Sequence, residues 1–186
     1  MKRLFDLFLL LLLLPLIVLP AAIVAMAVLI VSGLPILYWS DRVGKNNQIF
    51  RMPKFRTMLL DTPALPTDQL HNPSRYLIPT GGLIRKLSLD ELPQLWSILK
   101  GEMSFVGPRP ALFNQHQLIS DRTNLQIHTL LPGLTGWAQV NGRDDLSDQQ
   151  KVSYDSEYLQ RQSLLFDIKI IGLTALRVIK SDGVAH

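Results

Sequence analysis

The chain has 186 residues, which suits one domain with a modest core. It contains no cysteine, so disulfides, thiolate metal sites and cysteine nucleophiles are excluded, and its four histidines show no metal-ligand spacing. The net charge of +4 suits anionic lipid or phosphorylated substrates. Because the sequence has no nucleic-acid module and no basic run with interleaved aromatic residues, we predict no nucleic-acid partner.

The N-terminal part of the chain is a long apolar run. Residues 7–40 carry no charge and consist mainly of Leu, Ile, Val and Ala. A membrane-crossing helix needs roughly 20 apolar residues, so this run is too long for one straight span. Pro15 and Pro20 lie inside it and each removes a backbone donor, which predicts a kink between residues 14 and 20.

The charges that flank this run indicate its topology. Lys2 and Arg3 precede it, and five cations follow it within residues 42–56. Positive residues mark the cytoplasmic side of a membrane. A re-entrant helix that breaks at the prolines and returns to the same face satisfies both flanks, whereas the alternative is a single kinked span. Both interpretations place the rest of the chain at the cytoplasmic face. We therefore divide the chain into a re-entrant membrane helix (residues 1–40) and a cytoplasmic, membrane-associated domain (residues 41–186).

Short elements are predicted in the first half of this domain. β-Favouring residues at 36–39 and 48–58 surround Gly44-Lys45-Asn46-Asn47, which predicts a β-hairpin. Residues 61–79 are rich in Pro, Thr, Asp and Asn and predict a loop over the site. Short helices are expected at residues 82–86, 91–99 and 111–120.

Glycine-rich stretches and two helices are predicted in the second half. Residues 101–110 and 131–145 are punctuated by glycine and predict turns and loops. Residues 147–160 predict a helix with Ser147 as its N-cap. Charges interrupt the apolar residues of 164–180, so this helix is expected either in the membrane interface, with its cations snorkelling toward headgroups, or packed on the core.

The predicted fold class is α+β. It comprises a mainly helical small domain with a short β-hairpin, an N-terminal re-entrant membrane helix broken at proline, and C-terminal interfacial amphipathic helices.

Two adjacent carboxylates form the most informative motif. Neighbouring side chains on a helix point in different directions, so Asp90 and Glu91 are better placed for two tasks at one site than for sharing one proton. The structural alternative is a capping box that runs from Ser88 to Glu91. Pro93 weakens this alternative, because it would lie beyond the first turn and remove a hydrogen bond.

Three further motifs suit a phosphate ligand. Lys54-Phe55-Arg56-Thr57-Met58 follows the apolar run, and its cations can steady a phosphate or hold lipid headgroups. Gly107-Pro108-Arg109-Pro110 fixes the backbone on both sides of a guanidinium, whose planar fork suits phosphate; the alternative is a rigid turn with an exposed arginine. Residues 136–143 offer an aromatic plane, amides and an arginine, or alternatively a core tryptophan.

In this order the motifs resemble those of the monotopic phosphoglycosyl transferases, also called bacterial sugar transferases, over almost the whole chain. The stretches that carry the resemblance are residues 54–58, 89–94, 100–110 and 132–143. One departure is Leu14-Pro15, where the family often has Ser-Pro.

The resemblance implies transfer of a sugar 1-phosphate from a UDP-sugar to polyprenol (undecaprenyl) phosphate, with release of UMP. It places this reaction at the cytoplasmic face of the bacterial inner membrane, as the start of glycoconjugate or polysaccharide assembly. Asp90 matches the family's nucleophile, which forms a covalent phospho-sugar intermediate, and Glu91 matches the residue that binds Mg²⁺. Arg109 matches a phosphate-contacting arginine. Weaker correspondences, expected to bind substrate, are Lys54, Arg56, Arg85, Gln94, Asn141 and Arg143.

Two other functions stay open on the sequence. A membrane-anchored glycosyltransferase would move only the sugar and release UDP, and a scaffold of the same fold would perform no chemistry. Intact Asp90, Glu91 and Arg109 argue against a scaffold, which needs none of them. The expected partners are a UDP-sugar, polyprenol phosphate and the phospholipid membrane, and the sequence does not indicate an oligomeric state.

Overall fold

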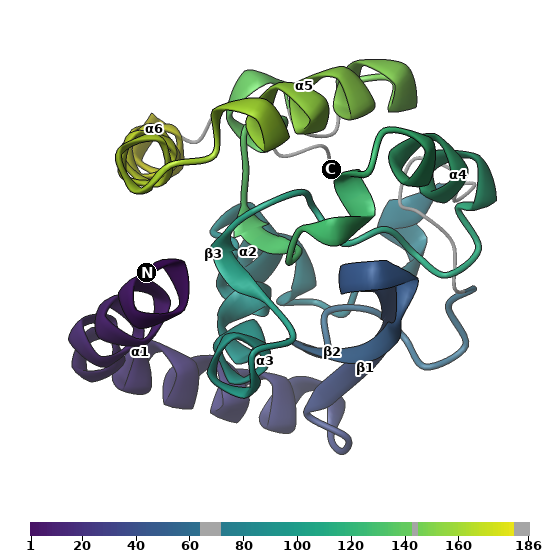
Figure 1. Ribbon diagram of the computed structural model, residues 1–186. Helices are drawn as coiled ribbons and strands as arrows, with labels where there is room; N and C mark the ends of the chain where they lie inside the picture. The colour runs from purple at the N-terminus through teal and green to yellow at the C-terminus, as the bar shows by residue number, and fades with distance from the viewer. Residues whose placement is uncertain (64–71, 143–144, 181–186) are drawn as a thin grey trace.

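The structure is a computed structural model that describes residues 1–63, 72–142 and 145–180. One long helix, two small sheets and several short helices make up the fold (Figure 1). The predicted α+β class, mainly helical with a short hairpin, is confirmed at this level.

Helix α1 (Lys2–Ser32) contains both Pro15 and Pro20. Among the described helices, it alone is long and apolar enough to cross a membrane. Figure 1 shows that α1 changes direction along its length. The predicted break at proline is therefore a bend within one helix, since the helix continues through both prolines.

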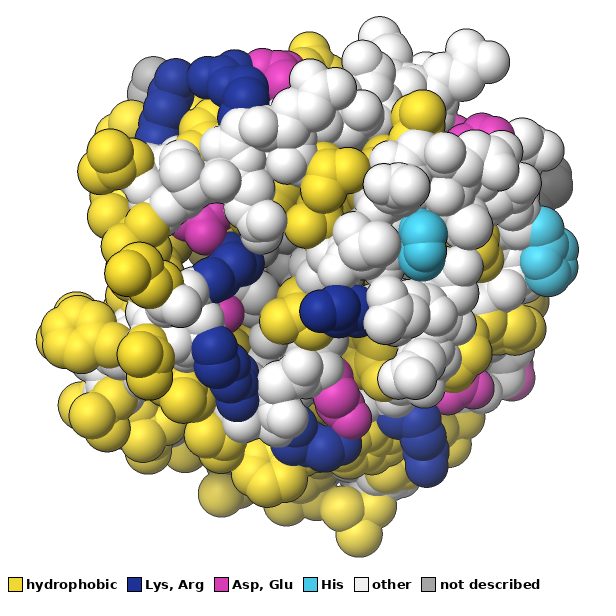
Figure 2. All heavy atoms as spheres, in the orientation of Figure 1, with side chains coloured by type: hydrophobic (Ala, Val, Ile, Leu, Met, Phe, Trp, Pro, Cys, Tyr) yellow, Lys and Arg dark blue, Asp and Glu magenta, His cyan; other side chains and the backbone are white. Residues whose placement is uncertain are grey.

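Both halves of α1 pack on the rest of the fold. Leu10 belongs to the main hydrophobic cluster, and Val24 and Val28 pack with Phe55 and others in a second one. The side chains of α1 that face away from these clusters are exposed. Figure 2 shows hydrophobic side chains gathered along the left and lower edges of the molecule, where α1 and α6 lie in Figure 1.

Polar contacts hold the N-terminal end of α1. Lys2 Nζ lies 2.5 Å from Asp167 Oδ2 on α6 (Leu164–Lys180). The fully buried Asp6 accepts hydrogen bonds at Oδ1 from Ser104 Oγ at 3.0 Å and from the Phe105 backbone N–H at 3.1 Å. The start of α1 is thus joined to two elements that come late in the chain.

The predicted β-hairpin is confirmed. Strand β1 (Leu37–Val43) pairs antiparallel with β2 (Ile49–Phe55), and a short 3-10 helix, η1 (Lys45–Asn47), forms the turn. In this register Tyr38 lies opposite Lys54. The first strand extends beyond the predicted residues 36–39 because ladder pairing continues to Val43 opposite Ile49.

The segment around the carboxylates forms short helices. Helix α2 (Gly81–Lys86) precedes the 3-10 helix η4 (Leu89–Gln94), which leads directly into α3 (Leu95–Lys100). Ser88 has a left-handed backbone with φ 54° and its side chain caps nothing, so the capping-box alternative is wrong. The helix predicted over residues 91–99 is therefore two helices, because the chain tightens into a 3-10 helix around Pro93.

A second sheet forms where turns and loops were predicted. Strand β3 (Ser104–Val106) pairs parallel with β4 (Gly133–Thr135). The backbones of these two segments approach so closely that a Cβ built on Gly133 would lie 2.1 Å from the Gly107 nitrogen. This pairing joins segments far apart in sequence, so local residue patterns carry little sign of it.

Helix α4 (His116–Asn124) begins later than the predicted residues 111–120. The reason is that the Ala111 carbonyl accepts from the Val43 N–H, and Leu112 forms a bridge with Arg42, so this stretch extends the hairpin edge. The remaining short 3-10 helices are η3 (Pro73–Tyr76), η5 (Ile127–Thr129) and η6 (Gln139–Asn141).

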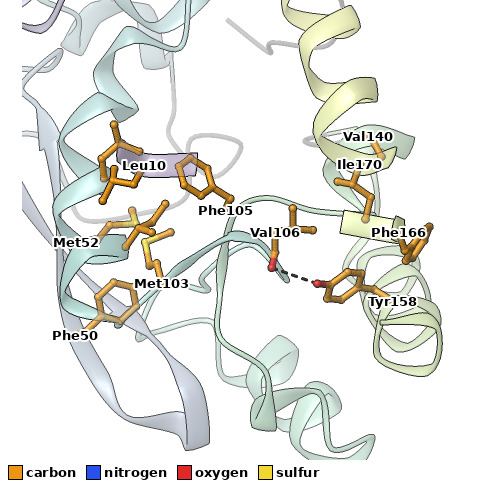
Figure 3. Packing of buried hydrophobic residues seen from close by; sticks show 12 residues of the cluster. Leu10, Phe50, Met52, Met103, Phe105, Val106, Val140, Tyr158, Phe166 and Ile170 are labelled. Carbon is orange, nitrogen blue, oxygen red and sulfur yellow. Dashed lines mark hydrogen bonds between the residues drawn. The ribbon is translucent and has the colours of Figure 1, made fainter. Parts of the chain in front are cut away.

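Helix α5 (Asp148–Arg161) is capped by Ser147 through a full capping box with Gln150, which confirms the predicted N-cap. Helix α6 then returns across β3 and β4 with Phe166 and Ile170 buried and Leu165 exposed. Figure 3 shows the main cluster, in which Tyr158 donates to the Val106 carbonyl at 3.3 Å. This core ties α1, the hairpin, α3, β3 and the last two helices together.

Candidate active site

Asp90 and Glu91 lie on η4, which packs against β2 and α2. Each residue is only 8% exposed. Burial removes water from both carboxylates, and such a placement is costly unless cations compensate. The left-handed backbone of Ser88 turns the chain into η4, and Pro93 suits a short helix whose hydrogen bonds are few.

Two cations from distant elements bind Glu91. Lys54 Nζ on β2 lies 2.9 Å from Glu91 Oε1, and Arg109 Nη2 lies 3.0 Å from the same oxygen. Lys54 also lies 3.5 Å from Asp90 Oδ2. The structure thus brings together the Lys54 motif, the carboxylate pair and Arg109, as the sequence predicts.

Asp90 differs electrostatically from an exposed aspartate. Burial raises the pKa of Asp90, and the charge of Glu91 raises it further, whereas Lys54, Arg85 and Arg109 act in the opposite direction. A carboxylate that is poorly solvated and more basic than usual is a better nucleophile. The same surroundings place three cations where an anionic substrate would be attracted.

Arg42 also belongs to this cluster, although the sequence motifs did not single it out as a site residue. Burial and the nearby charge of Arg109 lower the pKa of Arg42 to about 10, while Glu91 raises it. Its guanidinium donates to Ser40 Oγ at 3.0 Å and to the Pro110 carbonyl at 3.2 Å. The available signal was the strand alternation that places residues 40 and 42 on one face.

Two other predicted residues also lie around the carboxylates. Arg85 on α2 influences the charge of Asp90 and places Nη1 3.2 Å from Met58 Sδ. Gln94 is 2% exposed, and its Nε2 has no hydrogen-bond partner within the described ranges. Both N–H donors of this buried amide are therefore open to a ligand oxygen.

Some predicted residues have bonds elsewhere. Arg56 Nη2 donates to the Ser32 carbonyl at 2.6 Å and the Gly33 carbonyl at 2.8 Å, so it satisfies the C-terminal end of α1. Asn141 donates to the Trp137 carbonyl at 2.7 Å. Trp137 itself packs on Phe166 at 5.0 Å between ring centroids, as the core-tryptophan alternative expects. Arg143 and part of the predicted loop over the site, residues 64–71, lie outside the described residues.

The residue types fit a magnesium ion shared with a substrate. The described parts of the chain contain no group of three or more His, Cys, Asp or Glu residues that could hold a metal alone. Mg²⁺ is commonly bound by one or two carboxylates together with phosphate oxygens and water. The adjacent carboxylates of Asp90 and Glu91 match that requirement when a diphosphate supplies the other ligands.

A small open pocket lies beside Arg109, between the hairpin turn and η5. Its lining includes Gly44, Asn47, Arg109, Arg122 and His128.

The chain is similar to known sugar transferases. The chain is 40% identical to the uncharacterized sugar transferase EpsL of Bacillus subtilis, over 99% of this chain and 90% of that protein. It is 42% identical to the undecaprenyl-phosphate glucose phosphotransferase of Komagataeibacter xylinus, over 97% of this chain but 36% of that longer protein. It is also 38% identical to the UDP-glucose:undecaprenyl-phosphate glucose-1-phosphate transferase of Xanthomonas campestris, over 84% of this chain and 34% of that protein. The family model of the bacterial sugar transferases matches residues 1–181. The chain therefore belongs to the bacterial sugar transferase family.

Proposed function

We propose that this protein transfers a sugar 1-phosphate from a UDP-sugar to undecaprenyl phosphate and releases UMP. The names of the relatives from Komagataeibacter and Xanthomonas support this reaction class. The observation that carries the proposal is the buried Asp90 carboxylate with its raised pKa, set among Lys54, Arg85 and Arg109. In a cell this step would begin glycoconjugate or polysaccharide assembly.

The proposed reaction has two steps. An Asp90 carboxylate oxygen attacks the phosphorus that bears the sugar, the bond to the bridging oxygen breaks, and UMP leaves with the electron pair. A phosphate oxygen of undecaprenyl phosphate then attacks the same phosphorus, which forms the diphosphate and frees Asp90. A covalent intermediate of this kind divides one difficult displacement into two easier ones.

The other charged side chains stabilise the anions. Lys54 and Arg109 lie at hydrogen-bond distance from Glu91, so they are close enough to contact phosphate oxygens bound beside it. Gln94 is proposed to donate its buried Nε2 to a substrate oxygen. Glu91 would hold Mg²⁺, which when bound neutralises the charge of the diphosphate.

We further propose that α1 is re-entrant and that the site faces the cytoplasm. Both ends of α1 contact the same body: Lys2 binds Asp167, and Arg56 binds the Ser32 carbonyl. A helix that crossed the membrane would carry one of its ends to the opposite face. Because the chain has no cysteine, one cysteine placed ahead of Met1 and another at Gln149 on α5 can be compared directly. Equal protection of both from an impermeant outer-face reagent is expected, and selective labelling of the first would establish a span.

The interfacial position of α6 is proposed from its exposed face. Leu165 on α6 is 80% exposed, and Leu125, at the end of α4, is 48% exposed. An environment-sensitive fluorophore on Leu165→Cys is expected to shift to shorter wavelength with anionic vesicles, and on Leu125→Cys it is not. Identical spectra at both positions would remove α6 from the interface.

The reaction class is tested by its nucleotide product. Detergent-solubilised protein is incubated with a panel of UDP-sugars and undecaprenyl phosphate, and the nucleotide is identified. UMP is expected. UDP would indicate a glycosyltransferase that moves only the sugar, and no product with any donor would favour a scaffold.

A further inference from the structure

The backbone carbonyls of residues 108–111, which include the Pro-Arg-Pro turn, each accept a hydrogen bond from another element. The Pro108 carbonyl accepts from the Gly133 N–H at 2.9 Å, and the Ala111 carbonyl accepts from the Val43 N–H at 2.9 Å. These two bonds attach the ends of the turn to β4 and to β1. The two carbonyls between them, of Arg109 and Pro110, accept from arginine side chains instead.

Arg122 on α4 binds the first of these carbonyls. Its Nη1 donates to the Arg109 carbonyl at 2.8 Å. Its Nε and Nη2 donate to Asp155 Oδ2 on α5 at 3.0 Å and 2.6 Å. Asp155 is 1% exposed, so this pair holds the Arg122 guanidinium in one orientation.

Arg42 on β1 binds the second carbonyl. Its Nη1 donates to the Pro110 carbonyl at 3.2 Å, and its Nε donates to the buried Ser40 hydroxyl at 3.0 Å. Arg42 therefore approaches the turn from the hairpin, whereas Arg122 approaches it from the helical side.

A purely structural role would not require these charges. Burial and then repulsion from Arg109 lower the pKa of Arg42, so its charged form is disfavoured at this position even though Glu91 favours it. Replacing a buried ion pair by apolar side chains of similar volume often leaves the stability of a protein unchanged or higher. The burial of these arginines is therefore weak evidence that their role is to stabilise the fold. The two arginines instead hold in place the backbone of the turn that carries Arg109, whose side chain contacts Glu91.

We propose that Arg42 and Arg122 are positioning residues, which clamp the Arg109 backbone so that the Arg109 guanidinium is held at Glu91 and the donor phosphate. The proposal rests on the proposed function in so far as Arg109 contacts that phosphate. Both arginines act through Arg109, and Asp155 acts through Arg122.

The test is a double-mutant cycle with Arg109→Ala. Arg42→Met is expected to lower kcat by about 10–100-fold, the loss that a misplaced catalytic group causes, with KM changed little and Tm within about 2 °C. In the Arg109→Ala background the same change is expected to cost no more than about threefold, because the group being positioned is already gone. Arg42→Lys, which keeps a donor, is expected to restore part of kcat. Arg51→Met, on the partner strand of the hairpin and away from the turn, is the matched control.

A second variant protects the test against misfolding. Arg122→Met combined with Asp155→Leu removes both members of the buried pair, so no unpaired charge remains. This double variant is expected to lower kcat by about as much as Arg42→Met does. In the Arg109→Ala background it is expected to cause no comparable loss in kcat. The proposal is overturned if both variants turn over like Arg51→Met, or if their losses multiply with that of Arg109→Ala.

Hydrogen exchange separates this proposal from the proposed function. If wild-type protein releases no nucleotide, the proposed function fails, yet the clamp can still be measured. Peptides covering residues 105–114 are expected to exchange faster in Arg42→Met than in wild type or Arg51→Met. Unchanged exchange in that peptide would overturn the clamp.

Discussion

At the scale of single residues, the two adjacent carboxylates have different surroundings. Glu91 Oε1 receives both Lys54 and Arg109 at hydrogen-bond distance, whereas the nearest cation contact of Asp90 is Lys54 at 3.5 Å. Glu91 is thus held by two cations, whereas burial raises the pKa of Asp90 above its ordinary value. Asp90 and Glu91 can have different roles although they are adjacent in sequence, because neighbouring side chains on a helix point in different directions.

Replacing Asp90 by asparagine is expected to abolish transfer and to stabilise the fold. The pKa of Asp90 is raised in the folded chain, so its contribution to the free energy of unfolding is fully present below about pH 3.8 and is lost as the pH rises through the folded pKa. At neutral pH the charged form is a penalty that Asn lacks. We expect Tm to rise by about 2–4 °C, the effect of roughly 1 kcal/mol in a domain of this size, measured by thermal unfolding at pH 7. An unchanged rate of transfer would eliminate Asp90 as the nucleophile.

Lys54→Met is expected to shift the pH dependence of transfer. Lys54 lowers the pKa of Asp90, so its removal raises that pKa further, and the acid limb of the rate profile moves to higher pH. The rate at neutral pH should fall by about 10–100-fold, as for loss of one preorganised charge. The control is Lys100→Met, whose exposed pair with Glu102 lies outside the site. A profile that keeps its acid limb after Lys54→Met would contradict the account.

At the scale of elements, helix α1 is joined to the fold by buried polar contacts as well as by apolar packing. Asp6 is fully buried and accepts two hydrogen bonds from the β3 strand. Its position on an otherwise apolar helix makes sense only with these partners, since an unpaired buried carboxylate is costly.

Asp6→Leu is expected to destabilise the protein by about 1–3 kcal/mol, because the Ser104 hydroxyl and the Phe105 N–H lose their acceptor. The measurement is chemical unfolding in detergent. Asp41→Leu, at an exposed position of β1, is the control and should change stability little. If both variants lost the same free energy of unfolding, the buried hydrogen bonds of Asp6 would not contribute to stability.

Elements defined by local chemistry could be predicted from the sequence. The hairpin follows from a polar turn between β-favouring residues, and α5 follows from the Ser147 cap. The pairing of β3 with β4 could not be predicted, because three-residue strands are too short for a pattern and their contact is non-local. The late start of α4 also results from a non-local contact, because the Ala111 carbonyl accepts a hydrogen bond from the Val43 N–H.

The candidate site was predictable to a similar degree. Asp90, Glu91, Lys54 and Arg109 converge as the motifs indicate. Arg56 was expected among the substrate-binding residues, but its described bonds go to the end of α1, which a motif match cannot reveal.

At the scale of the whole molecule, the fold places a buried carboxylate pair, its cations and an apolar face on one body. The hydrophobic side chains of α1 and α6 gather on one side (Figure 2), and the carboxylates lie on η4, which contacts α1. A reaction between a water-soluble nucleotide sugar and a lipid phosphate needs this combination, because the two substrates come from different phases.

The most direct test of the account is to look for the covalent intermediate. Protein is mixed with a UDP-sugar labelled in the sugar, without undecaprenyl phosphate, and residue-level mass spectrometry locates the label. The account predicts a phospho-sugar adduct on Asp90, release of an equal amount of UMP, and loss of the adduct when undecaprenyl phosphate is added. An adduct on another residue, labelling of Asp90→Asn, or transfer without any UMP released before the acceptor is added would contradict it.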